Sequence, residues 1–224
     1  MAGVERPRRS TPEETPRAAS TNGGGEGLTE ADVGPEPMPE VVRWVDEARD
    51  AGVRDWDAMV VATCGEGGVP SARVVLLRGL DERGFCFYSS YESRKGRELA
   101  VNPRAAVVLH WREQGRQIRA VGVVTKLKPE ESTGYWRNRP LASRLSAWAS
   151  QQSDPVRDRA ALEEAVAAVQ ARFGDDDVPL PPFWGGYRVT PDEVELWQHR
   201  DDRLHDRIAY RREDGSWIRE RLQP

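Results

Sequence analysis

Apolar and polar positions follow two different periods along the chain. Over residues 35–53 the apolar positions recur at helical spacing, with Val41, Val42, Val45 and Ala48 able to share one face and Gly52 in a stop position. The pattern then changes to short runs rich in β-branched and aromatic residues, separated by turn-forming residues. These runs span residues 58–64, 71–79, 84–90, 105–111 and 117–127. One amphipathic helix followed by five closely spaced strands is therefore predicted.

The rest of the chain adds helices and further strands. Short helices are predicted within residues 93–101 and 128–140. The longest helix is expected over residues 154–173, where Asp154 can cap it and Pro155 can occupy its first turn. Further strands are predicted at residues 185–191, 193–198, 204–212 and 217–222. The fold class is thus mainly β with flanking helices (α+β), as an antiparallel barrel or sandwich.

The first 35 residues differ in composition from the rest. They are rich in Pro, Gly, Ser, Thr and Glu and contain few large apolar side chains, so burial cannot offset the entropy of ordering them. Residues 1–35 are predicted to be a disordered tail. Residues 36–224 are predicted to form a single domain.

Composition narrows the function classes. The formal net charge of −4, with 31% charged residues, argues against a generally basic nucleic-acid or membrane binder. No apolar run approaches the length of a membrane span, and a cytoplasmic location is expected. Cys64 and Cys86 lack the CxxC spacing of a metal or redox site, and neither a P-loop nor a Rossmann fingerprint occurs. We therefore expect no metal, and any anion site must be a local cluster.

Two such clusters lie in the first half of the domain. Alternation along residues 71–79 sends Arg73 and Arg78 to opposite faces of one strand. Arg94 and Lys95 follow at a predicted helix N-terminus, where cations are unfavourable unless an anion is bound nearby. The combination suits a phosphate, and the alternative is strand-end charges that reach solvent.

A third cluster is the stretch "RLHDR". In a strand, Arg203, His205 and Arg207 would share one face and together favour an anion. The alternative is the solvated face of an edge strand, where positive charge discourages aggregation. Nearby, Trp197 could stack on a flat heterocycle or fill the core. His199 is interpreted as an exposed turn residue.

The segment between the predicted helices carries further polar side chains. Its hydrogen-bonding residues are Tyr135, Arg139, Ser143, Gln152 and Ser153. Segments that are neither clearly helix nor clearly strand often carry binding residues. The alternative is that Tyr135 belongs to the core and Ser153 caps the following helix. Both interpretations can hold together.

Eight motifs in order carry a family resemblance. They are "SARVVLLRG", "FYSSYESRKGREL", "GRQIRAVG", "YWRNRP", "WASQQS", "FWGGYRV", "LWQ" and "RLHDR". On these motifs the chain resembles the pyridoxine (pyridoxamine) 5′-phosphate oxidases, FMN-dependent enzymes with a split β-barrel. The resemblance runs from about residue 57 to the C-terminus and implies an antiparallel FMN-binding split barrel.

The resemblance also implies roles for single residues. The FMN-binding residues would be Arg73, Val74, Tyr88, Ser89, Arg94, Lys95, Gln117, Gln152, Ser153, Trp197 and Arg207. The substrate phosphate would be held by Arg78, Tyr135, Arg139 and Ser143. Arg203 and His205 would face the pyridine ring of the substrate and are the implied catalytic residues.

The implied reaction converts pyridoxine or pyridoxamine 5′-phosphate to pyridoxal 5′-phosphate. A hydride passes from C4′ of the substrate to N5 of FMN, and O₂ then reoxidises the flavin to give H₂O₂. The implied partners are the phosphorylated vitamin B6 substrate and O₂, with no nucleic acid and no membrane. In the family the two FMN sites lie at a homodimer interface, so a homodimer is expected.

Three departures from the family pattern bear on the substrate. Position 78 is arginine where the family usually has lysine, no tyrosine precedes Tyr88, and residues 197–205 are unusually charged. Arg78 is compatible with a carboxylate substrate, so a phenazine-biosynthesis oxidase acting on a dihydrophenazine carboxylate is the alternative. A non-catalytic flavin or pyridoxal-phosphate carrier is a third hypothesis, and nucleic-acid binding is a fourth that the acidic balance disfavours.

Overall fold

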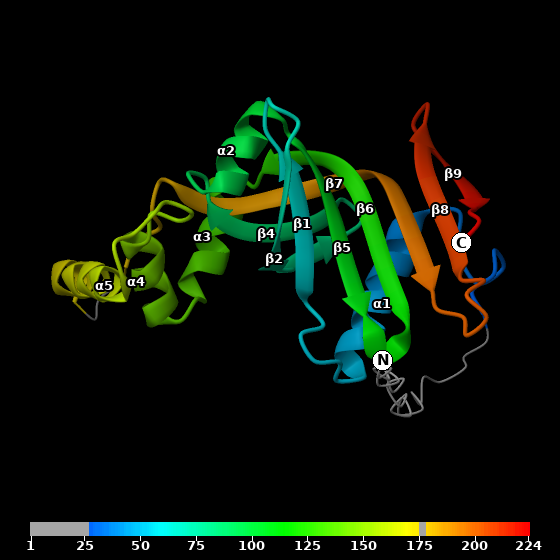
Figure 1. The fold of residues 1–224 in the computed structure, drawn as a ribbon, viewed down its shortest axis with the longest axis horizontal. Helices are drawn as coiled ribbons and strands as arrows, with labels where there is room; N and C mark the ends of the chain where they lie inside the picture. The colour runs from blue at the N-terminus through cyan, green and yellow to red at the C-terminus, as the bar shows by residue number, and fades with distance from the viewer. Residues whose placement is uncertain (1–26, 175–177) are drawn as a thin grey trace, which may run out of the picture.

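The computed structural model describes residues 27–174 and 178–224 (Figure 1). They form a mainly antiparallel β half-barrel with flanking helices, as the sequence pattern predicts. The strands are β1 (Ala58–Cys64), β2 (Pro70–Leu76), β3 (Gly79–Asp81), β4 (Gly84–Ser90), β5 (Arg104–Trp111), β6 (Arg116–Lys126), β7 (Trp184–Gln198), β8 (Asp206–Glu213) and β9 (Ser216–Arg221). The helices are α1 (Pro37–Asp50), α2 (Arg94–Val101), α3 (Pro129–Arg137), α4 (Leu141–Ala149) and α5 (Arg159–Phe173), with a 3-10 turn at Arg112–Gln114.

The sheet runs in the order β2-β1-β5-β6-β7-β4-β3, and β8 and β9 extend it from the far part of β7. Figure 1 shows α3, α4 and α5 at one end of the molecule and the β8–β9 hairpin at the other. The long strand β7 connects the two ends. It pairs with β4 near its start and with β8 near its finish.

Apolar alternation places the main core between the sheet and α1. Val41, Trp44, Val45 and Ala48 of α1 are buried, and β5 buries every second residue. A smaller apolar cluster joins α3 and α4 to the start of β7. It contains Trp136, Leu145, Val178 and Trp184. Two cores therefore support the two ends of β7.

The predicted break near residue 192 is wrong, because β7 is a single strand across residues 184–198. Instead of a break, the pairing register between β6 and β7 shifts between Val121 and Gly122 of β6. A side chain on Gly122 would place its Cβ 2.1 Å from the carbonyl oxygen of Thr190. Only glycine permits this close approach of the two backbones.

The predicted start of the longest helix is also wrong. α5 begins at Arg159, and the Asp158 carboxylate caps it by accepting a hydrogen bond of 2.8 Å from the Ala161 amide. Asp154 and Pro155 precede this helix rather than starting it. The segment before it, in which neither a clear helix nor a clear strand was predicted, contains α4.

The "RLHDR" stretch is not a continuous strand. β8 begins only at Asp206, and Arg203 has a φ of 64°, in the left-handed region. The prediction that Arg203, His205 and Arg207 share one strand face is therefore wrong. Arg203 and His205 lie in the connection from β7, while Arg207 lies on β8.

Contacts with the domain begin earlier than the predicted boundary near residue 35. Leu28 and Val33 are buried in the main core. Arg221 of β9 bonds the Glu30 carboxylate at 2.8 Å, and the Tyr210 hydroxyl donates to the Gly34 carbonyl at 2.9 Å. The predicted tail over residues 1–26 lies outside the described residues. No helix in the described part is long and apolar enough to span a membrane.

Candidate functional site

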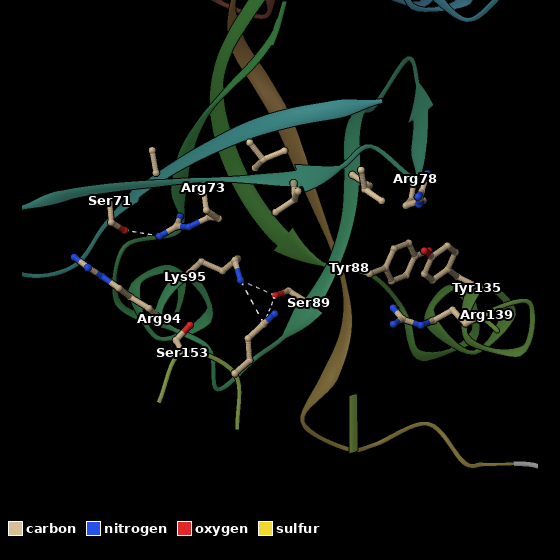
Figure 2. Close-up of a pocket in the computed structure, with 15 residues that line it drawn as sticks. Ser71, Arg73, Arg78, Tyr88, Ser89, Arg94, Lys95, Tyr135, Arg139 and Ser153 are labelled. Atoms are coloured by element: carbon tan, nitrogen blue, oxygen red, sulfur yellow. Dashed lines mark hydrogen bonds between the residues drawn. The ribbon is translucent and has the colours of Figure 1, made fainter. Parts of the chain in front are cut away.

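The cavity that best fits the predicted site lies between β2, β4, α2 and the α3 region, with a volume of about 480 Å³. Eleven of the predicted site residues line it: Arg73, Val74, Arg78, Tyr88, Ser89, Arg94, Lys95, Tyr135, Arg139, Gln152 and Ser153. Figure 2 shows the cations in two groups, with Arg73, Arg94 and Lys95 toward one end and Arg78 and Arg139 toward the other. The chain thus forms a cavity with two separate cationic ends.

Lys95 is the most deeply buried cation of the first end. Its ammonium group donates to the Ser89 hydroxyl at 2.9 Å and to the Gln152 side-chain oxygen at 3.4 Å (Figure 2). Desolvation, with a smaller contribution from Arg73, lowers the pKa of Lys95 to about 8. Burial of an ammonium group is unfavourable without a matching anion, so this end favours a bound anion.

The start of α2 fixes the position of Lys95. Ser93 caps the helix by accepting the Gly96 amide hydrogen at 3.3 Å. A Cβ on Gly96 would lie 2.1 Å from the Tyr91 carbonyl oxygen, so glycine allows the helix to begin directly against the end of β4. The first turn carries Arg94 and Lys95 and no acidic residue. Both the helix dipole and the side chains there favour an anion.

Arg73 reaches the same end from β2. Its guanidinium donates to the Thr63 hydroxyl at 2.6 Å and to the Val61 carbonyl at 3.2 Å. It also bonds the Ser71 hydroxyl, as Figure 2 shows. These contacts hold the guanidinium along the cavity wall rather than in solvent.

The second end is aromatic as well as cationic. Tyr88 and Tyr135 stack with ring centroids 3.9 Å apart, and the Arg139 guanidinium lies 4.6 Å from the Trp184 ring. Burial, followed by the nearby charge of Arg78, lowers the pKa of Arg139. The Nε atom of Arg139 is buried and has no hydrogen-bond partner among the described residues. A buried donor of this kind favours an incoming acceptor.

Ser143 faces an adjoining hollow of about 440 Å³ that shares Tyr88, Ser89, Arg139 and Gln152 with the first cavity. Arg139 donates to the Ser143 carbonyl at 3.1 Å. Ser143 therefore lies beside the second end. Ser146 of α4 and Ser150, which caps the C-terminus of that helix, also line the hollow.

Five predicted site residues do not line either hollow. They are Gln117, Trp197, Arg203, His205 and Arg207. Trp184 and Trp197 lie at opposite ends of the 15-residue β7. At about 3.3 Å per residue, they are separated by roughly 40 Å measured along the strand. One subunit therefore does not bring the two groups together.

Four of these five residues form a cluster of their own. Gln117 pairs with Trp197 and Trp197 with Arg207 in the sheet register. The rings of Trp197 and His205 have centroids 4.7 Å apart. The Arg200 amide donates to His205 Nδ1 at 3.0 Å, so the neutral ring carries its proton on Nε2. This face thus presents an indole, a ring N–H donor and a guanidinium.

Three residues of the site escaped the sequence interpretation. Trp184 begins the "WGG" motif and packs against both Tyr135 and Arg139, a role that the motif alone did not indicate. Ser71 and Glu98 contact Arg73, and only the spacing of Glu98 four residues after Arg94 gave a signal. Ser71 lies on the same strand as Arg73, and Glu98 reaches Arg73 from α2, so this second contact depends on how α2 packs beside β2.

Metal ligands and reactive thiols are the other candidate chemistry of the chain. The described residues contain no group of three or more His, Cys, Asp or Glu side chains that could hold a metal ion. Cys86 is buried, and desolvation raises the pKa of its thiol to about 11. That thiol is protonated at neutral pH and therefore a poor nucleophile.

Family models match nearly the whole described chain. The model described as pyridoxamine 5′-phosphate oxidase matches residues 45–173. The model of the pyridoxine 5′-phosphate oxidase C-terminal dimerisation region matches residues 184–224. The second match contains Trp197, Arg203, His205 and Arg207 and supports a homodimer.

Individual relatives agree with the family match. A pyridoxine/pyridoxamine 5′-phosphate oxidase of Rubrobacter xylanophilus is 50% identical over 198 residues, covering 88% of this chain and 91% of that protein. The crystal structure of PhzG from Burkholderia lata, in complex with tetrahydrophenazine-1-carboxylic acid, superposes with a TM-score of 0.83 at 37% identity, covering 88% and 98%. A pyridoxamine 5′-phosphate oxidase-related, FMN-binding protein of Nostoc punctiforme shares the fold, with a TM-score of 0.67 at 20% identity and coverage of 84% and 97%.

The matches span both the cavity and the C-terminal cluster, and they confirm the family predicted from the sequence motifs. They also confirm FMN, the cofactor of that family, as the cofactor expected for this chain. The chain belongs to the pyridoxamine 5′-phosphate oxidase family of split-barrel flavoproteins.

Proposed function

We propose that this protein is an FMN-dependent oxidase that converts pyridoxine 5′-phosphate or pyridoxamine 5′-phosphate to pyridoxal 5′-phosphate. One observation carries the proposal: a single cavity has cationic groups at two ends, with Ser89 beside the first and Tyr88 beside the second. A flavin mononucleotide and a phosphorylated substrate together bring two phosphates, one for each end. The relatives named as pyridoxine/pyridoxamine 5′-phosphate oxidases support this assignment.

The first end has the donors that a cofactor phosphate requires. Arg73, Arg94 and Lys95 supply positive charge, and Ser153 adds a hydroxyl. Gln152 already bonds Ser89 at 2.8 Å, which fixes its side chain at the cavity wall. We assign the FMN phosphate to these residues. Val74, Tyr88 and Ser89 line the same cavity and would contact the rest of the cofactor.

The second end is assigned to the substrate phosphate. Arg139 has a buried donor that lacks a partner, and Tyr135 and Ser143 lie next to it. Arg78 contributes charge but is bound to Asp57 at 2.5 Å, so it acts as part of an ion pair. The substrate ring would then lie between this end and the flavin, near Tyr88.

We assign the predicted site residues of the dimerisation region to the partner subunit's site. Trp197, Arg203, His205 and Arg207 lie in the matched dimerisation region and away from the cavity of their own subunit. A symmetric dimer presents the same surfaces on both subunits, so each subunit can complete the cavity of the other. Two composite sites per homodimer follow, with Gln117 beside Trp197.

The chain's own groups orient the reactants and hold protons. FMN, when bound, accepts a hydride and is reoxidised by O₂. His205 presents Nε2–H as a hydrogen-bond donor because its Nδ1 accepts the Arg200 amide. Arg203 adds a second donor, which is cationic. Together they would bind the substituents of the pyridine ring and stabilise the oxygen or nitrogen that becomes the carbonyl or imine.

A second candidate function is oxidation of a dihydrophenazine carboxylate. The PhzG structure superposes on 88% of this chain, and it contains a tricyclic carboxylate, tetrahydrophenazine-1-carboxylic acid. Arg78 could pair with a carboxylate if it exchanged its present partner, Asp57. The phosphate-type donors around Arg139 favour the vitamin B6 substrate over this one.

Oxygen consumption by the purified FMN-loaded protein tests the proposal. Pyridoxine 5′-phosphate and pyridoxamine 5′-phosphate should support H₂O₂ formation, and unphosphorylated pyridoxine should be a much poorer substrate. Turnover of a dihydrophenazine carboxylate alone would favour the second candidate. Absence of turnover with all of these compounds would favour a flavin carrier.

A further inference from the structure

A carboxylate lies directly behind the cations of the first cavity end. Glu98 of α2 has a side chain that is 11% exposed, and it follows Arg94 by one helical turn. Its Oε1 accepts from Arg94 Nε at 2.9 Å. Its Oε2 accepts from the Thr63 hydroxyl at 2.5 Å and the Ser71 hydroxyl at 2.6 Å, and lies 3.4 Å from an Arg73 nitrogen. One carboxylate therefore links α2 to both β1 and β2.

Glu98 is ionised at every pH near neutrality. Desolvation works to raise its pKa, but hydrogen bonds from Ser71, Thr63 and Arg94 outweigh it and lower the pKa to about 2. Both arginines are consequently held by a permanent negative charge. An ordinary surface ion pair between helix residues four positions apart would explain only the contact between Glu98 and Arg94. It does not explain the contacts with Ser71, Thr63 and Arg73 on two other strands.

The charge count of this cluster suits a phosphate. Arg73, Arg94 and Lys95 provide three positive charges, and Glu98 removes one. The surplus is about two positive charges, close to the charge of about −1.5 to −2 on a phosphate monoester at neutral pH. Glu98 thus limits the repulsion between the cations while the cavity is empty of phosphate, and it leaves the charge needed to bind one.

We propose that Glu98 is a positioning residue for the cofactor phosphate. It holds the Arg73 and Arg94 guanidinium groups at the cavity wall, and the Ser71 hydroxyl, which bonds both Glu98 and Arg73, is part of the same device. The arginines then bind the phosphate without first losing side-chain freedom. The inference rests on the proposed location of the FMN phosphate.

The test compares FMN with riboflavin, which lacks the phosphate. Flavin fluorescence titrations of the full-length, flavin-depleted chain measure both dissociation constants. Glu98→Gln puts an amide where a carboxylate accepted hydrogen bonds from Arg94 and Arg73. We expect a Kd for FMN raised about tenfold, the equivalent of one charge-assisted hydrogen bond. The Kd for riboflavin should stay within about twofold, which also shows that the variant is folded.

Two further variants control for charge and for folding. Glu92→Gln removes an exposed carboxylate just before α2, and should leave FMN binding unchanged or slightly tighter. Ser71→Ala keeps every charge but removes the hydroxyl that bonds Glu98 and Arg73. It should weaken FMN selectively by about threefold, because it removes a neutral hydrogen-bonding group.

The outcomes separate this inference from the proposed function. If Glu98→Gln binds FMN as tightly as the parent protein or tighter, or weakens riboflavin equally, the positioning role is wrong. Lys95→Gln tests the phosphate location itself. If Lys95→Gln weakens FMN selectively while Glu98→Gln does not, only the role of Glu98 fails. If Lys95→Gln affects FMN and riboflavin alike, the phosphate does not lie at this end, and both proposals fail.

Discussion

Burial makes the charged forms of two cationic side chains in the cavity less favourable. It lowers the pKa of Lys95 to about 8 and also lowers the pKa of Arg139. Single residues of this kind could be identified from the sequence, because cations in a helix first turn or in a Tyr and Trp segment are unusual. Their partners could not, since the contact of Lys95 with Gln152 joins segments 57 residues apart, and the contact of Arg73 with Thr63 depends on the register of β1 against β2.

The pKa of Lys95 predicts a pH dependence of cofactor binding. A phosphate beside Lys95 stabilises the ammonium form, so the pKa rises when FMN binds, and binding above pH 8 requires uptake of a proton. The affinity for FMN should be constant from about pH 7 to 8 and then fall by up to about tenfold per pH unit. Titrations of FMN at pH 7, 8 and 9 measure this. Riboflavin affinity should not follow the same curve, and a flat FMN profile would contradict the assignment.

Arg139 is expected to bind the substrate rather than the cofactor. Arg139→Ala should raise KM for pyridoxine 5′-phosphate by about tenfold to a hundredfold, as expected for loss of charge-assisted hydrogen bonds. The FMN content of the purified variant should be unchanged. Arg137→Ala, an exposed arginine at the end of α3, is the matched control and should leave KM unaltered. Loss of flavin from Arg139→Ala would place this residue at the cofactor end instead.

At the scale of elements, the pattern of apolar and polar residues predicted the strands well. Residues 58–64 and 84–90 are β1 and β4 with the predicted bounds, because both strands are bounded by turn chemistry. The errors fall where two signals compete. Asp154-Pro155 and Asp158 are both capable of starting a helix, and only the second caps α5. The alternating charges in "RLHDR" resemble a strand, although the backbone at Arg203 is left-handed.

The segment before α1 is expected to contribute to stability. Leu28 is 7% exposed and belongs to the main core. Leu28→Ala should lower the free energy of unfolding by about 2 kcal/mol, at the low end for a core leucine because the segment can relax. Urea denaturation measures the change. Leu162→Ala, at an exposed position of α5, should cost less than about 0.5 kcal/mol. Equal effects would show that residues 28–33 do not pack on the domain in solution.

At the scale of the whole molecule, one subunit contains both groups of site residues but keeps them at opposite ends of β7. The sequence predicted the members of both groups through family motifs. It could not place them relative to one another, because that depends on the curvature of the sheet and on the dimer. We propose that the dimer interface brings Arg203 and His205 of one subunit to the cavity lined by Lys95 and Arg139 of the other.

Mixed dimers test this arrangement. Arg139→Ala and Arg203→Ala should each have little activity alone. In a dimer of one subunit of each kind, one composite site carries both substitutions and the other carries neither. Random reassociation of equal amounts should therefore restore about a quarter of the parent activity. Activity that stays at the level of the separate variants would show that the two residues act within one subunit.

The most direct test of the proposed function is an anaerobic absorption spectrum of the FMN-loaded protein before and after addition of pyridoxine 5′-phosphate. The proposal predicts bleaching of the oxidised flavin band, followed by its return when O₂ is admitted, with pyridoxal 5′-phosphate formed in equal amount to the flavin reduced. A flavin that stays oxidised with pyridoxine and pyridoxamine 5′-phosphate, but is bleached by a dihydrophenazine carboxylate, would contradict it.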